Sequence, residues 1–154
     1  MKVSKILKNK GTDCFSIEPD QLLCEAVKLM TQHKIGSLLV MENGNLKSIV
    51  TERDVMGAVG KYKDRITGIK VEEVMAPSLV TCCSDDDIAS AMDQMTNNAT
   101  KCWIRHLPVV DEGKLSGLIS IGDIVHALLE EAKFENRLLK NYIQNWPEED
   151  ADGD

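Results

Sequence analysis

Residues 117–124 bring together side chains that could do chemistry at one predicted junction between a strand and a helix. An apolar run ends there in Ser120, Gly122 and Asp123, and a helical pattern of apolar residues follows. The hydroxyl and the carboxylate can cap the helix, because both accept hydrogen bonds from its first free N–H groups. They can also face a polar ligand, since the same junction offers N–H groups and the positive end of the helix dipole to an anion. The pair by itself leaves both functions open.

A second junction of the same kind lies 69 residues earlier in the chain. Thr51 and Asp54 repeat the spacing of hydroxyl and carboxylate where another predicted strand enters a helix. The glycines of two predicted hairpin turns, Gly44 and Gly113, have the same 69-residue offset. Two caps could descend from one ancestral sequence as readily as two binding sites. The repetition therefore does not decide between the two functions.

The elements around the two junctions are predicted to occur twice in the same order. A short strand is followed by a helix, then by two strands that form a hairpin, then by a second helix. The predicted strands lie at 15–17, 37–41 and 46–51 in the first copy and at 79–81, 107–110 and 115–120 in the second. The early elements differ by 65 residues rather than 69, which indicates a four-residue insertion around 97–103. Such a repeat indicates a tandem duplication whose halves should pack as one pseudo-symmetric body.

Composition limits the classes of function. The chain has 154 residues, of which 43% are hydrophobic and 28% charged, with a net charge of −7. The acidic balance argues against a general binder of nucleic acid or of a membrane surface, which would need a basic face. The absence of an apolar run of about 18 residues and of a secretory signal predicts a cytoplasmic protein. The five cysteines form no C-x-x-C pair, which predicts free thiols and leaves a redox function of Cys82 or Cys83 open.

With both junctions and both hairpins in order, the sequence resembles a tandem pair of cystathionine-β-synthase (CBS) domains, the unit called a Bateman module. The segments that carry the resemblance are 48–55, 117–124, 104–111 and the starts of the repeats, such as 74–81. The resemblance covers about residues 3–130 and implies a mixed α+β fold of two β-α-β-β-α repeats with a C-terminal helix. We place the first repeat at 1–60, a linker at 61–70, the second repeat at 71–133, the C-terminal helix at 134–147 and an acidic, disordered tail at 148–154.

The resemblance implies that clefts between the two repeats take adenosine-containing ligands such as AMP, ADP, ATP, NAD(H) or S-adenosylmethionine. In ligand-binding members of the family the aspartate holds the ribose hydroxyls, which assigns ribose to Asp54 and Asp123. A carboxylate suits this function, because it can accept from both vicinal hydroxyls. The preceding hydroxyls, Thr51 and Ser120, would then lie toward phosphate or ribose.

Further positions around the clefts follow from the same resemblance. Arg53 could pair with a phosphate through two hydrogen bonds. Gly122 would let the backbone approach the ligand closely. The backbone around the first strand of each repeat reads the base in this family. The remaining residues that we expect at the clefts are Ile17, Thr81, Ser37 and Pro108.

Arg105 and His106 lie on the middle strand of the second copy, where alternation points one side chain inward and the other outward. They could form a phosphate clamp, since related modules place basic side chains here. They could equally be a surface arginine beside a histidine bonded to backbone. The first copy has uncharged Gly36 and Ser37 at this place, and Ser48 where the family often has glycine. We therefore expect two clefts of unequal affinity.

These features predict a non-catalytic regulatory module that binds an adenosine nucleotide and signals to a separate effector protein by a conformational change. No cofactor, metal site or catalytic residue is expected, because no nucleophile–base pair, phosphate-binding loop or set of metal ligands is recognisable. The alternative is a structural or protein-interaction module whose clefts take no nucleotide. The last helix continues past residue 130 with many apolar residues, and we expect it to contact the second subunit of a homodimer.

Overall fold

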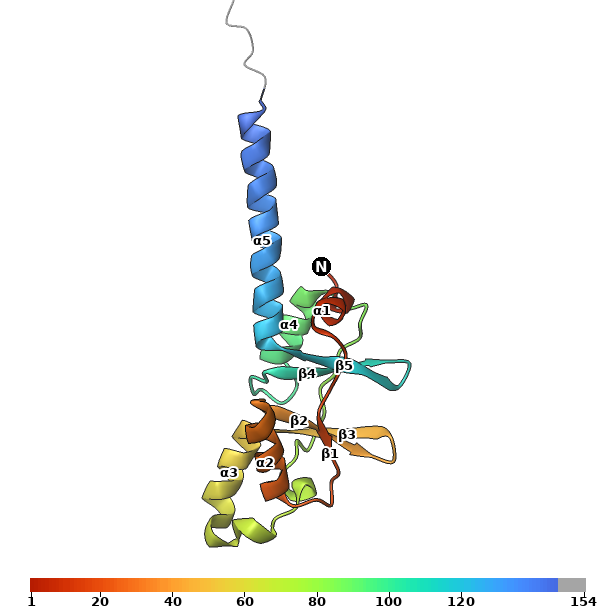
Figure 1. The fold of residues 1–154 in the computed structure, drawn as a ribbon, viewed down its shortest axis with the longest axis vertical. Helices are drawn as coiled ribbons and strands as arrows, with labels where there is room; N and C mark the ends of the chain where they lie inside the picture. Colours follow the sequence, from red (N-terminus) through yellow and green to blue (C-terminus); the bar gives the residue numbers. More distant parts are fainter. Residues whose placement is uncertain (147–154) are drawn as a thin grey trace, which may run out of the picture.

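The chain forms a mixed α/β structure in which two small sheets face each other and helices cover their outer sides (Figure 1). The computed structural model describes residues 1–146. This architecture confirms the predicted fold class. The elements in chain order are α1 (Val3–Lys10), β1 (Ser16–Ile17), α2 (Leu23–His33), β2 (Ser37–Glu42), β3 (Asn45–Thr51), α3 (Glu52–Tyr62), the 3-10 turns η1 (Lys63–Gly68) and η2 (Val71–Glu73), α4 (Ile88–Thr96), β4 (His106–Asp111), β5 (Lys114–Ser120) and α5 (Ile121–Gln144).

Both predicted hairpins form, and their turns explain why. β2 pairs antiparallel with β3, and β4 pairs antiparallel with β5. Each hairpin is closed by two residues of positive φ, 51° and 77° at Asn43 and Gly44, and 50° and 76° at Glu112 and Gly113. Turns of this kind match the right-handed twist of the strands, and glycine adopts a positive φ without steric cost. The turn sequences therefore determine the register of both hairpins.

The first strand forms in only one of the two repeats. β1 runs parallel to β2, and the N–H of Leu39 donates to the carbonyl of Phe15 over 3.1 Å. In the second repeat the strand that the sequence predicts is reduced to a single bridge between Cys82 and Val109. Pro108 explains the loss, because it stands where the first repeat has Leu39 and has no N–H to donate.

Two hydrophobic cores form, and each takes in the opening segment of the other repeat. Helix α1 opens the first repeat, yet Val3, Ile6 and Leu7 are buried in the core that α4, β4, β5 and the base of α5 enclose. Conversely, Ile69 and Val71 lie at the start of the second repeat but are buried in the core of the first. Each core therefore contains residues from both repeats, which interlocks the two.

Matching backbone hydrogen bonds hold the two exchanged segments in place. The N–H of Val3 donates to the carbonyl of Asp86 over 2.9 Å, and the N–H of Val71 donates to the carbonyl of Gln21 over 2.9 Å. The same contact is thus made twice, once by each opening segment. A repeat of about 60 residues buries little apolar surface by itself, so the exchange provides the shared packing that a pseudo-symmetric body requires.

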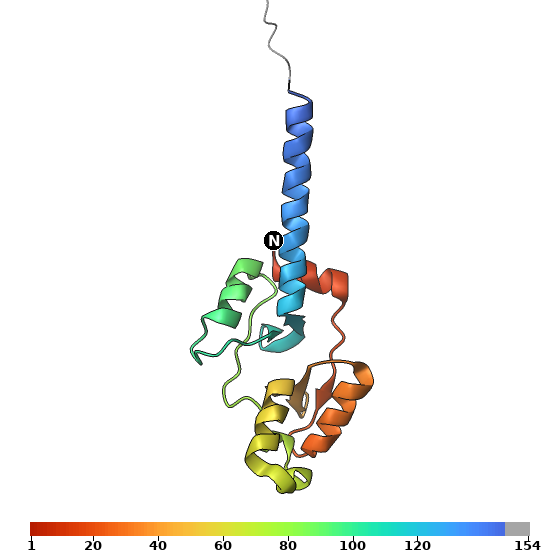
Figure 2. The ribbon, with the colours of Figure 1, turned by 90° about the vertical axis from the view of Figure 1, so that its left-hand side faces the viewer.

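Helical structure runs through the places where we predicted boundaries. α3 continues to Tyr62, and η1 occupies most of the predicted linker, with Ile66 packed against the first core. α5 is one helix of 24 residues without a break at residue 134. Its distal half projects beyond the rest of the molecule in both views (Figures 1 and 2). The predicted acidic tail, 148–154, lies outside the described residues. Within residues 1–146, every helix is too short or too polar to cross a membrane.

Candidate functional site

The two hydroxyl–aspartate pairs lie at the boundary between the repeats, because the helices that carry them begin there. β3 and β5 contact each other across this boundary. α3 and α5 start where these strands end and run away from each other (Figures 1 and 2). The first free N–H groups and the positive dipole ends of two helices therefore lie in one region of the molecule.

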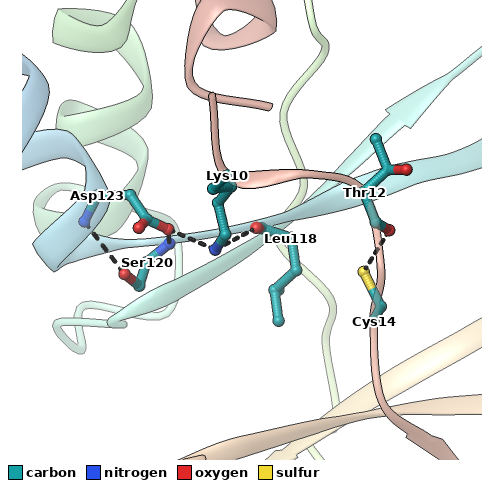
Figure 3. Close-up of polar contacts among 6 residues, drawn as sticks. All are labelled: Lys10, Thr12, Cys14, Leu118, Ser120 and Asp123. Atoms are coloured by element: carbon teal, nitrogen blue, oxygen red, sulfur yellow. Dashed lines mark hydrogen bonds and ion pairs between the residues drawn. The ribbon is translucent and has the colours of Figure 1, made fainter. Parts of the chain in front are cut away.

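The pair in the second repeat caps helix α5. The N–H of Ser120 donates to Oδ2 of Asp123 over 2.8 Å, and the N–H of Asp123 donates to Oγ of Ser120 over 3.1 Å (Figure 3). This reciprocal capping box satisfies two backbone donors at the start of the helix. The capping function is thus present, and it occupies only Oδ2 of the carboxylate.

Lys10, at the end of α1, forms an ion pair with Asp123 that the repeat pattern does not predict (Figure 3). Its Nζ lies 2.7 Å from Oδ2 of Asp123 and also donates to the carbonyl of Leu118 over 3.0 Å. Burial alone would raise the pKa of the Asp123 carboxyl, but the hydrogen bonds from Lys10 and from the Ser120 N–H outweigh it and hold the pKa below its usual range. Ser78 stands at the matching position of the second opening segment, so the repeats offered no signal for this lysine.

The pair in the first repeat has a different environment. The N–H of Thr51 donates to Oδ2 of Asp54 over 2.8 Å, and the Thr51 hydroxyl donates to the same oxygen over 3.0 Å. Within residues 1–146, no lysine or arginine forms an ion pair with Asp54. The two carboxylates therefore differ in charge compensation, although both lie at the start of a helix.

Arg53 connects the two repeats. Its Nη1 donates to the backbone carbonyl of Trp103 over 2.7 Å. Trp103 lies in the segment 97–103, around which the second repeat carries its four-residue insertion. Arg53 is exposed, and a guanidinium has five N–H donors. Its other donors are available for a further acceptor such as a phosphate.

Arg105 and His106 separate as strand alternation predicts. Arg105 is exposed, whereas His106 is half-buried beside Lys10, Asp123 and, from the first repeat, Glu52. Burial lowers the pKa of His106, and the positive charge of Lys10 lowers it further, against the opposite effect of the two carboxylates. His106 is therefore the member of the pair that lies among charged groups from both repeats.

The other predicted residues lie in two kinds of surroundings. Gly122 is exposed, and an added Cβ would meet only the Ser120 hydroxyl at 3.6 Å, so the fold itself does not require a glycine there. Thr81 is half-buried in a loop, while the side chains of Ile17, Ser37 and Pro108 are buried. For those three positions, only the backbone could meet a ligand.

One hollow includes the first residue of α3, and another includes a residue in the first turn of α5. One of about 410 Å³ lies between α2 and α3 and includes Glu52 among its lining residues. The other, of about 870 Å³, lies between α1 and the base of α5 and includes both Lys10 and Asp123. The ion pair is therefore accessible from an open surface.

Comparison with known proteins identifies the family of this architecture. A protein-family model of the CBS domain matches the chain twice, at residues 4–61 and 71–130. The chain is 33% identical over 151 residues to the mitochondrial CBS domain-containing protein CBSX3 of Arabidopsis thaliana, which covers 92% of this chain and 71% of that protein. Its fold is similar to the crystal structure of a CBS-domain containing protein from Agrobacterium tumefaciens, with 34% identity, a TM-score of 0.77, and coverage of 82% of this chain and 98% of that one.

Two solved structures of lower identity contain ligands and are similar in fold. The CBS domain pair of protein MJ0100, in complex with 5-methylthioadenosine and S-adenosyl-L-methionine, is 22% identical with a TM-score of 0.71, covering 85% of this chain and 98% of that one. CBSX2, in complex with AMP, is 24% identical with a TM-score of 0.69, and the coverage is again 85% and 98%.

Proposed function

Because the chain belongs to the CBS domain family, we propose that it is a non-catalytic regulatory module that binds an adenosine nucleotide between its two repeats. The observation that carries the proposal is the convergence of two hydroxyl–aspartate pairs, Thr51–Asp54 and Ser120–Asp123, on one boundary. The ligand classes are AMP, ADP, ATP, NAD(H) and S-adenosylmethionine. The ligands of the MJ0100 domain pair and of CBSX2 support an adenosine compound.

Each carboxylate is suited to a ribose. The caps use only Oδ2 of Asp54 and of Asp123. The other oxygen of each carboxylate can accept from ribose hydroxyls while the cap stays in place. Capping and ligand binding are therefore compatible functions of one side chain, which makes the choice between them unnecessary.

The phosphates would lie among the positive groups of the second junction. The N-terminus of α5 provides a site for an anion, and the positive side chains of Lys10 and Arg105 add donors beside it. His106, whose pKa is lowered, adds the N–H of a neutral ring. Arg53 offers a further guanidinium from the first repeat. The second junction has more positive groups than the first, which supports tighter binding on its side of the boundary.

Lys10 supplies a route from binding to a conformational change. A phosphate would draw the Lys10 ammonium group from Asp123, which lies 2.7 Å away, and would leave that carboxylate to the ribose. Lys10 ends α1, and α1 is packed in the second core. Binding would therefore shift α1 relative to α5. The ligand favours the shifted arrangement only by as much as its affinity differs between the two arrangements. That difference sets the size of the signal to a partner protein.

The proposed partners are the nucleotide, a second copy of the chain and a separate effector protein. The net charge of −7 disfavours nucleic acid and membrane surfaces as partners. A cytoplasmic location remains our prediction, although the similar protein CBSX3 is named as mitochondrial.

Titration calorimetry with AMP, ATP, NADH and S-adenosylmethionine tests the proposal. We expect saturable heat with at least one ligand and a rise in melting temperature that grows with its concentration. Absence of both effects with all four ligands would refute nucleotide binding and favour a structural or protein-interaction module. Conversion of a ligand to product during the incubation would refute the non-catalytic assignment.

Two matched substitutions test the assignment of ribose. Asp123→Asn and Asp54→Asn retain an oxygen that can accept the cap hydrogen bond but remove the charge, and we expect each to weaken binding at its own site by about 10- to 100-fold. Asp87→Asn is the control, because Asp87 caps α4 through the N–H of Ala89 and belongs to neither junction. Equal affinity in all three variants would show that the aspartates serve only as caps.

A further inference from the structure

Helix α5 carries an exposed stripe that begins near its base and runs to its end. Successive members of the stripe are alternately four and three residues apart: Val125, Leu129, Ala132, Asn136, Leu139, Ile143 and Trp146. All but one are apolar, and the exposed fractions of the large apolar members run from 43% at Val125 to 71% at Ile143. This spacing is the heptad pattern of a coiled coil. Four further exposed apolar residues of α5 lie outside it: Leu128, Phe134, Leu138 and Tyr142.

We propose that the stripe is the seam of a parallel two-stranded coiled coil formed with α5 of a second copy of this chain. In the heptad notation Leu129, Asn136 and Ile143 occupy position a. Val125, Ala132 and Leu139 occupy position d, and Trp146, two residues past the end of α5, continues the same spacing. Within α5 the seam runs from Val125 to Ile143, just under three heptads, and it keeps the bodies of the two copies at the same end of the coil. It rests on the structure of α5 and not on nucleotide binding.

Asn136 favours the parallel orientation. It is the single polar residue of the seam and stands at position a. In a parallel dimer position a faces position a of the partner, so the two Asn136 side chains can hydrogen-bond to each other. In an antiparallel dimer position a faces position d, and the amide would be buried against apolar side chains without a partner. The asparagine thus determines both orientation and register, at a cost in stability.

The charges beside the seam point to the same arrangement. Glu135 is at position g and Lys140 at position e, and in a parallel dimer position g faces position e five residues later in the partner. Because the dimer is symmetric, Glu135 of each copy pairs with Lys140 of the other, and the ion pair occurs twice. In an antiparallel dimer the e positions face each other, which would bring Lys133 and Lys140 together. Within residues 1–146, Lys133 already pairs with Glu130 at 3.4 Å, whereas Glu135 and Lys140 form no ion pair in the single chain.

Sedimentation equilibrium of the full chain tests the surface. We expect a dimer, and Leu139→Asp should raise the dimer dissociation constant by about 100-fold or more, because it places a charge at the centre of the seam. Leu138→Asp is the matched control: Leu138 is the adjacent leucine and is similarly exposed, at 53% against 62% for Leu139. Leu138 lies outside the seam, so Leu138→Asp should change the dimer dissociation constant by less than about threefold.

Charge reversal tests the orientation. Glu135→Lys or Lys140→Glu alone replaces two attractive pairs by repulsive ones and should raise the dissociation constant by about tenfold. The double variant Glu135→Lys/Lys140→Glu restores opposite charges and should recover the wild-type value. In an antiparallel dimer neither single variant creates a new like-charged contact, so no loss and rescue would occur.

Several results would overturn the proposal. A monomer at all concentrations would show that the stripe serves another occupant, such as a foreign helix. A trimer or tetramer would contradict the two-stranded seam. A dimer that survives Leu139→Asp would be held by another face of the molecule, and a dimer without the charge rescue would be antiparallel or differently registered.

Discussion

The two repeats have matching junctions but different surroundings for their aspartates. Asp54 accepts hydrogen bonds from Thr51, whereas Asp123 accepts from Ser120 and also from Lys10. The lysine comes from the opening segment that has crossed over to the other repeat. The comparison shows that duplication copied the caps, while the exchange of opening segments gave an ion-pair partner to Asp123 but, within residues 1–146, not to Asp54.

The same exchange explains a second difference, on the last strand of each hairpin. Gly117 in β5 lies against Leu7 of α1, and an added Cβ would lie 2.7 Å from Cδ2 of that leucine. Ser48 holds the matching position in β3, and its hydroxyl donates to the carbonyl of Ala76 over 2.6 Å. Each strand is thus adapted to the opening segment of the other repeat, and the two positions are not interchangeable.

The largest expected effect concerns Cys82, which stands where the first repeat has Ile17. Both side chains are 3% exposed. Burial raises the pKa of the Cys82 thiol to about 12, and the nearby carboxylate of Asp86 adds to the shift. Because the thiolate is the reactive form, native Cys82 should react with iodoacetamide on the order of 1000-fold more slowly than the exposed neighbour Cys83.

A time course followed by peptide mass spectrometry measures both rates, and in denaturant the two should converge. Comparable rates in the folded protein would show that Cys82 is not the core counterpart of Ile17. They would also revive a redox function for this pair of thiols.

Gly117 and Ser48 hold the matching strand position, and substituting either should lower the free energy of unfolding, more so at Gly117. Gly117→Ser forces the buried Leu7 side chain to move, and we expect the free energy of unfolding to fall by about 1–3 kcal/mol. Ser48→Ala removes one hydrogen bond from the carbonyl of Ala76 and should cost about 1 kcal/mol. Urea denaturation monitored by circular dichroism measures both. A Gly117→Ser variant as stable as wild type would mean that α1 does not pack as closely as the structure shows.

The ion pair that distinguishes the junctions should contribute less. Lys10→Gln should lower the free energy of unfolding by about 0.5–1 kcal/mol at pH 7, because the pair is partly exposed. The folded-state pKa of Asp123 is lowered. The stabilisation is therefore full above the unfolded-state pKa of about 3.9 and is lost as the pH falls through the folded-state value. Ser78→Ala, at the matching position, is the control and should show no such pH dependence.

Chemical denaturation between pH 7 and pH 2.5 makes this comparison. The difference between wild type and Lys10→Gln should shrink as the solution becomes more acidic. A difference that stays constant with pH would show that Lys10 acts through packing rather than through its charge.

The smallest effect on stability is expected at Pro108, the residue that prevents a parallel strand in the second repeat. Pro108→Leu gives β4 the N–H that Leu39 provides in β2, and that donor can reach the carbonyl at residue 80 as Leu39 reaches Phe15. The new hydrogen bond and the loss of proline rigidity oppose each other, so the free energy of unfolding should change by less than about 1 kcal/mol. Hydrogen exchange should show a protected amide at 108. A freely exchanging amide would mean that another feature prevents the strand.

The hairpins and the helices were predictable because their signals are local. The turns at 42–45 and 111–114 contain the glycines that positive φ requires, and the apolar spacing of α2 and α4 marks their buried faces. The strand at 79–81 was the exception. Its pattern was similar to that of β1, but the missing donor belonged to Pro108 on another strand, and pairing depends on both partners.

By itself the sequence determined the duplication, the order of elements in each repeat and the presence of Ser120–Asp123 and Thr51–Asp54 at strand–helix junctions. These features follow from periodicity and turn chemistry, which act over a few residues. Only the tertiary structure decided which repeat each opening segment joins. Lys10 and Asp123 are 113 residues apart, and no local pattern relates them. They meet because α1 buries its apolar face in the core of the second repeat. That burial carries the lysine to one junction, whereas Asp54 at the other forms no ion pair within residues 1–146.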